Sequence, residues 1–201
     1  ELHNVLVLRD VTDARAVAAR LDAGGPLVLL GGGFIGLEAA AVARSRGVSV
    51  TVVEITDLPL GRSLGGELAR RVVRLHEDRG VRFRTGRRAT TLHGRQDVEA
   101  VELDDGTRLE AATVLVGTGV VPHDELARQV GAYTNDGVVV DAYGRTSVPW
   151  LWAAGDVSTY VSPWTGRRQR IEHWDVAQRH GAVVGGNLAG ARTRNLEVPY
   201  F

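Results

Sequence analysis

Apolar residues along the chain occur both in short uninterrupted runs and at helical spacing, and this alternation predicts an α/β protein. Runs at Leu27–Leu30, Val48–Val53 and Thr113–Val116 are typical of parallel strands that are covered on both faces. The segment Phe34–Arg46 is rich in alanine and leucine and predicts a helix, and Glu67–Arg79 has the apolar spacing of an amphipathic helix. Each segment is followed by a glycine, which favours a helix end.

The remaining segments predict shorter elements. An N-terminal run at Val5–Leu8 precedes a helix that Thr12 is expected to cap, and Asp57–Gly66 is expected to be a loop. The Asp104-Asp105-Gly106 turn lies between alternating segments and predicts a small antiparallel meander. Beyond Pro122 we expect strands at 138–140 and 150–153, an exposed loop or hairpin at 158–170, and a last helix at 175–188.

The composition is that of a folded protein with balanced charge. Of the 201 residues, 44% are hydrophobic, which is enough for a sizeable core. Lysine plus arginine and aspartate plus glutamate both number 24, so the net charge of zero argues against nucleic-acid binding through bulk electrostatics. The sequence contains no cysteine, which excludes disulfides, thiolate metal sites and thiol catalysis within these residues. No metal-ligand spacing of His, Asp and Glu stands out, and no metal site is predicted.

Neither a membrane span nor a targeting segment is expected. No apolar run approaches the roughly 20 residues that cross a bilayer, and the first residues lack the basic and apolar regions of a signal peptide. We therefore expect a cytoplasmic protein. Because the chain begins with Glu1 rather than methionine, we expect it to be part of a longer polypeptide. The change of pattern near residues 119–122 predicts a boundary between domains at 1–119 and 120–201.

A glycine-rich turn between the first buried strand and its helix is the strongest functional signal. Its pattern is Gly31-x-Gly33-x-x-Gly36, with Phe34 and Ile35 at the start of the helix. The first glycine permits a tight turn, the second lets backbone approach a pyrophosphate, and the third allows close helix–sheet packing. The free N–H groups and the dipole of a helix N-terminus favour phosphate binding. We predict a dinucleotide site here; the alternative is a glycine turn that serves only packing.

An acidic residue about 20 positions further on indicates which dinucleotide binds. Glu54 follows the Val48–Val53 strand, where a carboxylate accepts hydrogen bonds from the hydroxyls of the adenosine ribose. This carboxylate would repel a 2′-phosphate, and Ile55 and Thr56 offer no cation for one, so NADH is favoured over NADPH. Glu38, expected in the first turn of the helix, either complements the helix dipole or lies near the nicotinamide carboxamide, and the sequence leaves both open.

Two further motifs follow apolar strands. The segment Gly117-Thr118-Gly119-Val120-Val121-Pro122 closes the first predicted domain; its glycines permit close approach of a cofactor, and a crossover linker is the alternative. The segment Thr146–Asp156 delivers Gly155 and Asp156 to the carboxyl end of a predicted strand, where α/β sheets place ligand-binding groups. Asp156 can accept hydrogen bonds from polyol hydroxyls, or it can cap a following turn.

The order of these three motifs resembles that of the FAD-dependent pyridine nucleotide-disulfide oxidoreductases, in which an NAD domain is inserted into an FAD domain. The Gly31–Gly36 turn resembles the second dinucleotide fingerprint of that family, Gly117–Pro122 its inter-domain motif and Thr146–Asp156 its second FAD motif. The segment Glu172-His173-Trp174 is similar to the one beside the isoalloxazine ring in ferredoxin and rubredoxin reductases of bacterial oxygenase systems. The resemblance covers essentially the whole chain.

The resemblance implies an α/β, Rossmann-like FAD/NAD(P)-binding fold, with 1–119 as the NAD-binding domain and 120–201 as the C-terminal half of the FAD-binding domain. It places Asp156 at the ribityl chain of the flavin, the backbone of Trp174 near the flavin ring and Glu38 near the nicotinamide. The first FAD fingerprint and the C-terminal interface domain of the family are not among these residues. The adenosine diphosphate site of FAD is therefore expected outside them.

By the same resemblance, the intact protein is expected to pass electrons from NADH through FAD to a ferredoxin or rubredoxin acceptor. The flavin would carry the chemistry, so no catalytic residue is predicted, and the fragment alone is expected to be inactive. An NADH oxidase or disulfide reductase of the same superfamily is one alternative, and a non-catalytic NAD-binding regulatory module is another. The Glu172–Trp174 segment favours the ferredoxin reductase, and no oligomeric state is implied.

The remaining candidates are single side chains. His173 and His180 are possible proton donors near a flavin, but His180 is expected at the surface of its helix. His76 and His93 lack evident partners and are expected to be exposed. The 158–170 segment contains three arginines, Arg167, Arg168 and Arg170. They suggest a docking patch for an acidic ferredoxin, but solvated charges on an exposed loop are the favoured interpretation.

Overall fold

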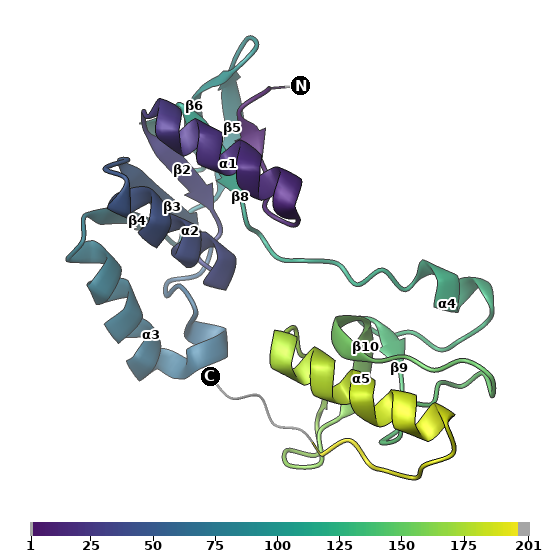
Figure 1. Cartoon of the computed structure of the whole chain (residues 1–201). Helices are drawn as coiled ribbons and strands as arrows, with labels where there is room; N and C mark the ends of the chain where they lie inside the picture. Colours follow the sequence, from purple (N-terminus) through teal and green to yellow (C-terminus); the bar gives the residue numbers. More distant parts are fainter. Residues whose placement is uncertain (1, 197–201) are drawn as a thin grey trace. The chain divides into compact units, whose positions relative to one another are not determined.

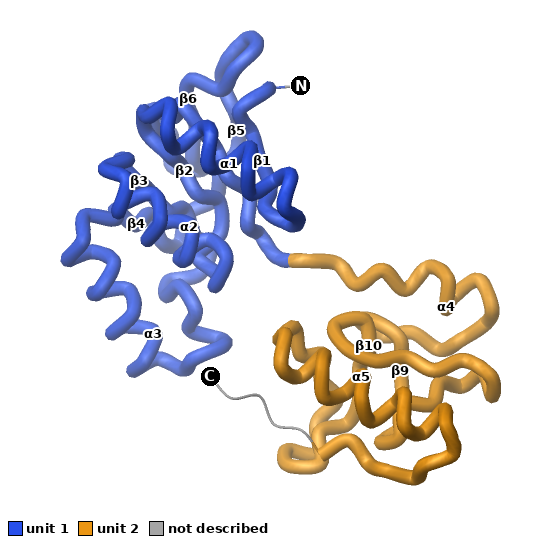
Figure 2. Tube along the Cα trace, viewed as in Figure 1, with its two compact units in different colours: residues 1–119 blue, residues 120–201 orange. Residues whose placement is uncertain are grey.

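The chain forms two compact units, residues 1–119 and residues 120–201 (Figure 2). The computed structural model describes residues 2–196. Unit 1 contains a parallel sheet, three helices and a second, antiparallel sheet, whereas unit 2 contains short strands, one short helix and one long helix (Figure 1).

The sheet at the centre of unit 1 has five parallel strands in the order β1-β8-β2-β3-β4. The strand β2 is central, so its Val28 pairs with Val114 on one side and with Thr51 on the other. Three helices follow β1, β2 and β3 in the chain. The bounds of these elements are β1 (Val5–Leu6), α1 (Val11–Ala23), β2 (Leu27–Leu30), α2 (Phe34–Ser45), β3 (Val50–Glu54), α3 (Gly61–Glu77), β4 (Val81–Thr85) and β8 (Thr113–Val116).

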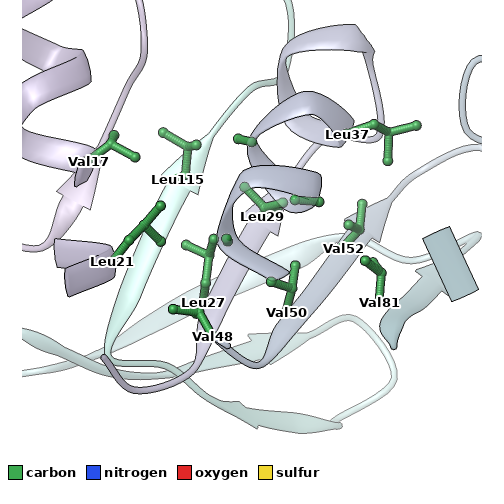
Figure 3. Close-up of a cluster of buried hydrophobic side chains, with 13 residues drawn as sticks. Val17, Leu21, Leu27, Leu29, Leu37, Val48, Val50, Val52, Val81 and Leu115 are labelled. Carbon is green, nitrogen blue, oxygen red and sulfur yellow. The ribbon is translucent and has the colours of Figure 1, made fainter. Parts of the chain in front are cut away.

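The two faces of this sheet carry two separate buried clusters. Leu27 and Leu29 point to one face, where they pack with side chains of α1 and α2 (Figure 3). Val28 points to the other face and packs with Val101 and Leu103 of a second sheet. That sheet is antiparallel, in the order β5-β6-β7, and consists of β5 (Ala89–Gly94), β6 (Val98–Leu103) and β7 (Arg108–Glu110). The predicted fold class, an α/β parallel sheet with a small antiparallel meander, is confirmed.

Unit 2 is built around a three-stranded sheet in the order β11-β10-β9. The strand β10 pairs parallel with β9 and antiparallel with β11. A small apolar cluster around Ala127, Ala132 and Val138 forms part of its interior. The elements are α4 (Glu125–Gln129), β9 (Val138–Val139), the 3₁₀ turn η1 (Gly155–Val157), β10 (Ser158–Val161), β11 (Arg168–Gln169) and α5 (Trp174–Leu188).

The structure corrects several predicted elements. Asp10, not Thr12, caps α1, because its carboxylate accepts hydrogen bonds from two backbone N–H groups and Asp13 returns the contact in a capping box. The predicted loop at 57–66 is partly helical, since α3 begins at Gly61 and is kinked at Gly65. The expected strand at 150–153 is an irregular segment in which Trp152 forms only an isolated bridge.

Candidate functional site

The glycine turn after β2 is packed too tightly for side chains. Gly31 has φ of 107°, and a Cβ added to it would lie 2.3 Å from the carbonyl oxygen of Gly117. A Cβ on Gly36 would lie 2.3 Å from the carbonyl oxygen of Gly31. The structure therefore brings two predicted motifs together, because the backbone that follows β8 lies directly against the turn that follows β2.

Helix α2 begins directly after this turn. Gly33 is the N-cap, makes no side-chain capping hydrogen bond, and has no atom within 4 Å of the position that a Cβ would take. Phe34 and Ile35 follow, exposed at 43% and 41%. A helix N-terminus that lacks a side-chain cap and faces open space is the arrangement that binds anions.

Glu54, at the end of β3, reaches across to the glycine turn. Its Oε2 accepts a hydrogen bond from the backbone N–H of Gly32 at 2.7 Å. Its Oε1 accepts from the backbone N–H of Thr56 at 2.8 Å and from the Thr56 hydroxyl at 2.9 Å. Burial raises the pKa of Glu54, but the hydrogen bonds from Thr56 and Gly32 outweigh burial and bring the pKa below its usual value of 4.5. The side chain is therefore a fixed, ionised carboxylate.

Gly32 and Thr56 belong to this arrangement and were not among the predicted site residues. A Cβ on Gly32 would lie 2.9 Å from the side chain of Pro59 and 3.3 Å from Oε2 of Glu54. The uninterrupted run of three glycines was the available signal for Gly32. A hydroxyl residue two positions after Glu54 was the signal for Thr56, since Thr side chains commonly bond neighbouring groups in turns.

Glu38 and Gly119 lie at the margins of the unit 1 site. Glu38 is the fifth residue of α2 and lies past the first turn, which contains no acidic residue, so the expected first-turn position is wrong. Its side chain is exposed and forms no hydrogen bond or ion pair with the described residues. Gly119 has φ of 113° and no atom near its Cβ position. Both residues are exposed and accessible to a ligand.

In unit 2, the turn η1 presents an aspartate to solvent. Gly155 has φ of 72°, a conformation that strains other residues, and Ala177 of α5 lies 3.4 Å from its Cβ position. Asp156 is exposed, and its carboxylate has no partner among the described residues. The side chain does not cap the turn, which was the alternative. An unpartnered carboxylate on a fixed turn is suited to accept hydrogen bonds from a ligand.

His180 lies beneath that turn and is buried, so its predicted surface position is wrong. The residue is 1% exposed, and its ring meets that of Tyr160 edge-on at 5.2 Å. Its Nδ1 lies 3.4 Å from the backbone nitrogen of Gly155 and 3.3 Å from Oγ of Ser158. Burial lowers the pKa of His180, which keeps the ring neutral near pH 7. The sequence signal for this burial was spacing, because His180 lies four residues after Val176 and four before Val184, which are both buried on the same face of α5.

The segment before α5 carries the other predicted residues of unit 2. Glu172 forms an ion pair with Arg170. His173 is the N-cap of α5 and makes no side-chain capping bond, and Trp174 is 77% exposed. Arg170 is largely buried, so its assignment to a solvated loop or docking patch is wrong, whereas Arg167 and Arg168 are exposed as expected.

Two histidines of unit 1 also differ from expectation. His93 is not isolated, because its Nε2 lies 2.7 Å from Oε2 of Glu102. His76 is partly buried, and burial together with the charge of Arg79 lowers its pKa. Within residues 2–196 no group of three or more His, Asp or Glu side chains could hold a metal ion, and no helix of those residues is long and apolar enough to cross a membrane.

A strand, a glycine turn, an uncapped helix and a carboxylate on the neighbouring strand together define unit 1 as an α/β dinucleotide-binding fold. Comparison with known sequences identifies the family within this fold class. The chain belongs to the pyridine nucleotide-disulphide oxidoreductase family, whose sequence profile matches residues 1–181. The resemblance seen in the sequence is thereby confirmed.

Individual relatives and solved structures agree with this family. The chain is 39% identical over 194 residues to the ferredoxin–NAD(+) reductase component of an anthranilate 1,2-dioxygenase system from Burkholderia cepacia, covering 96% of this chain and 48% of the relative. It is 40% identical to the corresponding biphenyl dioxygenase component of Paraburkholderia xenovorans, covering 99% and 48%. The crystal structure of a covalent putidaredoxin reductase–putidaredoxin complex matches with TM-score 0.94 and 33% identity, covering 98% and 48%. The chain thus spans about half the length of these relatives.

Proposed function

We propose that the intact protein is a flavin-dependent oxidoreductase that passes electrons from NADH through FAD to a ferredoxin or rubredoxin acceptor. In this proposal residues 1–119 are the NAD-binding domain and residues 120–201 are the C-terminal half of the FAD-binding domain. The proposal is supported by the family and by relatives named as ferredoxin–NAD(+) reductase and rubredoxin–NAD(+) reductase. A cytoplasmic location belongs to the same proposal, because NADH is available there.

The observation that carries the NADH assignment is the fixed carboxylate of Glu54 beside the turn Gly31–Gly36. A carboxylate oxygen can accept two hydrogen bonds, and Oε1 already accepts two from Thr56. Oε2 accepts one from Gly32 and has capacity for another, which a ribose hydroxyl would use. A 2′-phosphate at the same place would meet an ionised carboxylate, so the site favours NADH over NADPH.

The described residues of unit 2 fit half of a flavin site. Asp156 offers an unpartnered carboxylate for a ribityl hydroxyl, and the start of α5 at partly buried His173 and exposed Trp174 offers backbone and indole for the ring end. When bound, a flavin accepts two electrons together from a nicotinamide and can release them singly. The chain then has to bind and orient the flavin and the nicotinamide and to exclude water. Neither unit has to supply an acid, a base or a nucleophile.

The choice of acceptor rests on Glu172, His173 and Trp174 and on the names of the relatives. The backbone fold alone does not distinguish a ferredoxin reductase from other reductases with this fold, because an NAD-dependent persulfide reductase from A. fulgidus also matches with TM-score 0.90 at 30% identity. The test is therefore functional. Purified intact protein should show a flavin absorption spectrum, lose it on anaerobic addition of NADH, and then reduce a [2Fe–2S] ferredoxin or a rubredoxin.

Substitution of Asp156 links this test to the structure. Asp156→Ala should weaken flavin retention in the intact protein, whereas Asp104→Ala, which removes an exposed carboxylate from unit 1, should not. Full flavin occupancy in Asp156→Ala would contradict the ribityl contact. Intact wild-type protein that binds NADH but holds no flavin and shows no diaphorase activity would instead support the non-catalytic module.

A further inference from the structure

One buried arginine links three irregular segments of unit 2. Arg170 follows β11, and only 10% of its side chain is exposed. A buried guanidinium is strongly unfavourable unless acceptors surround it, so the positions of its partners and its own position depend on each other. Arg170 cannot present its charge to a protein partner from this position.

The partners of Arg170 come from segments that are far apart in the chain. Its Nη2 lies 3.3 Å from Oδ1 of Asp136, in the turn before β9. Its Nη1 donates to the backbone carbonyl of Asp156 at 3.4 Å and forms an ion pair with the carboxylate of Glu172. The guanidinium group of Arg170 thus contacts the turn at Asp136, the turn η1 and the segment that leads into α5.

Close packing reinforces these polar contacts. A Cβ on Gly137, where φ is 106°, would lie 2.4 Å from the carbonyl oxygen of Val157 and 3.0 Å from Cδ of Arg170. The turn that carries Asp136 therefore rests on the end of η1 and on the aliphatic part of the arginine. No sheet ladder runs through η1 or through residues 170–173, so the Arg170 contacts, together with the packing of Gly155 on Ala177 and His180, hold the two segments relative to each other.

We propose that Arg170 is a positioning residue for the flavin, which fixes Asp156 relative to Glu172 and Trp174. The inference rests on the proposed function, in which those two segments contact the ribityl and ring ends of FAD. Arginine is needed because a planar fork reaches separate acceptors with different nitrogens, whereas the single ammonium of lysine is a compact point charge. Because Arg170 contacts both segments, its substitution should both lower the affinity for FAD and change the orientation of the bound flavin.

The test uses the intact flavoprotein with two substitutions, Arg170→Gln and Arg170→Lys. The matched controls are Arg167→Gln and Arg167→Lys, which alter an exposed arginine of the same hairpin. We expect Arg170→Gln to weaken FAD binding by about tenfold or more, because Glu172 loses its buried partner. Arg170→Lys should retain more FAD but show a shifted flavin absorption band, and both Arg167 variants should match the wild type in FAD affinity and spectrum.

Arg170 variants that keep wild-type FAD affinity and an unchanged flavin spectrum would overturn the inference while leaving the proposed function intact. Wild-type protein without flavin would overturn both. If Arg170→Gln fails to fold by circular dichroism, Asp136→Asn and Glu172→Gln each remove one partner instead, and asparagine tolerates the positive φ of 49° at position 136. Both should alter the flavin band, and an unchanged band in both would refute the positioning role.

Discussion

Of the residues that the structure describes, unit 1 buries 22 hydrophobic ones and three polar ones, whereas unit 2 buries seven of each. The five-stranded parallel sheet of unit 1 has two apolar faces, and burial of such surface is the main source of folding free energy. Unit 2 has strands of two to four residues and relies on buried polar side chains such as Ser158, His180 and Asn187. The first unit should respond to lost volume, and the second to lost hydrogen bonds and to pH.

The aromatic residues allow the two units to be followed separately. All four tryptophans lie in unit 2, at positions 150, 152, 164 and 174. Tryptophan fluorescence therefore reports the unfolding of unit 2 alone, whereas far-ultraviolet circular dichroism reports both units. A substitution that acts on one unit should move only the transition of that unit.

The largest effect is expected from a cavity in unit 1. Leu29→Ala removes a side chain that is 1% exposed, and we expect a loss of about 3 kcal/mol in the free energy of unfolding. In a denaturant titration the dichroism transition should move while the fluorescence transition stays. Leu75→Ala, at a half-exposed position of α3, is the control and should cost less than about 1 kcal/mol. Equal shifts of both signals would show that the units unfold together.

The next effect is a steric one at the glycine turn. Gly31→Ala forces a Cβ against the carbonyl of Gly117 and requires positive φ, so we expect a loss of about 2 kcal/mol and of NADH binding. Gly24→Ala also places alanine at a positive φ, 79°, but has open space around the Cβ position, so it should cost less and leave NADH binding unchanged. Calorimetric NADH titration of both variants measures the difference. Normal NADH affinity in Gly31→Ala would contradict the close approach.

In unit 2 the corresponding change removes a buried amide. Asn187 donates to the carbonyls of Tyr143 and Thr193 and accepts from the N–H of Thr193. Asn187→Ala leaves those backbone groups without partners, at a cost of about 1.5 kcal/mol. The fluorescence transition should shift, whereas Gln178→Ala, on the exposed side of α5, should leave it in place. An unchanged fluorescence midpoint in Asn187→Ala would contradict the polar stabilisation of unit 2.

A change of nucleotide preference tests the carboxylate of unit 1. Glu54→Arg should move the ratio of NADH to NADPH affinity by about tenfold towards NADPH, which is about 1.4 kcal/mol. Glu54→Gln is the matched control, since it removes the charge but keeps the size, and its shift should be smaller. The measurement is the dissociation constant of each variant for NADH and for NADPH. Unchanged discrimination in Glu54→Arg would remove the role given to this residue.

The smallest effect is a pH dependence that belongs to unit 2. Burial lowers the pKa of His180 below its usual value of 6.5, so the unfolded chain takes up a proton at higher pH than the folded one. The stability of unit 2 should therefore fall as the pH drops through 6.5 and level off below the folded pKa. Fluorescence-detected unfolding at several pH values, compared with His180→Gln, isolates this contribution. Identical pH profiles in the two proteins would contradict it.

The sequence predicted the elements of unit 1 better than those of unit 2 for a physical reason. Continuous apolar strands and glycine turns are local patterns, so the run at 27–30 and the turn after it were found correctly. The burial of Arg170 depends on segments distant in the chain, such as the turn at Asp136, and no local pattern encodes it. The hydrogen bond from Gly32 to Glu54 was likewise beyond prediction, although Glu54 was a predicted site residue and Gly32 lies between two others, Gly31 and Gly33.

The position of β8 between β1 and β2 has a consequence for synthesis on the ribosome. Until residues 113–117 have left the exit tunnel, one edge of the apolar strand β2 has no neighbour, and the carbonyl that abuts Gly31 is not yet present. An unpaired apolar strand edge is a template for aggregation. A translational pause before these residues emerge from the tunnel would prolong that exposure, so such a pause should lower the yield of the protein more than a pause after they have emerged.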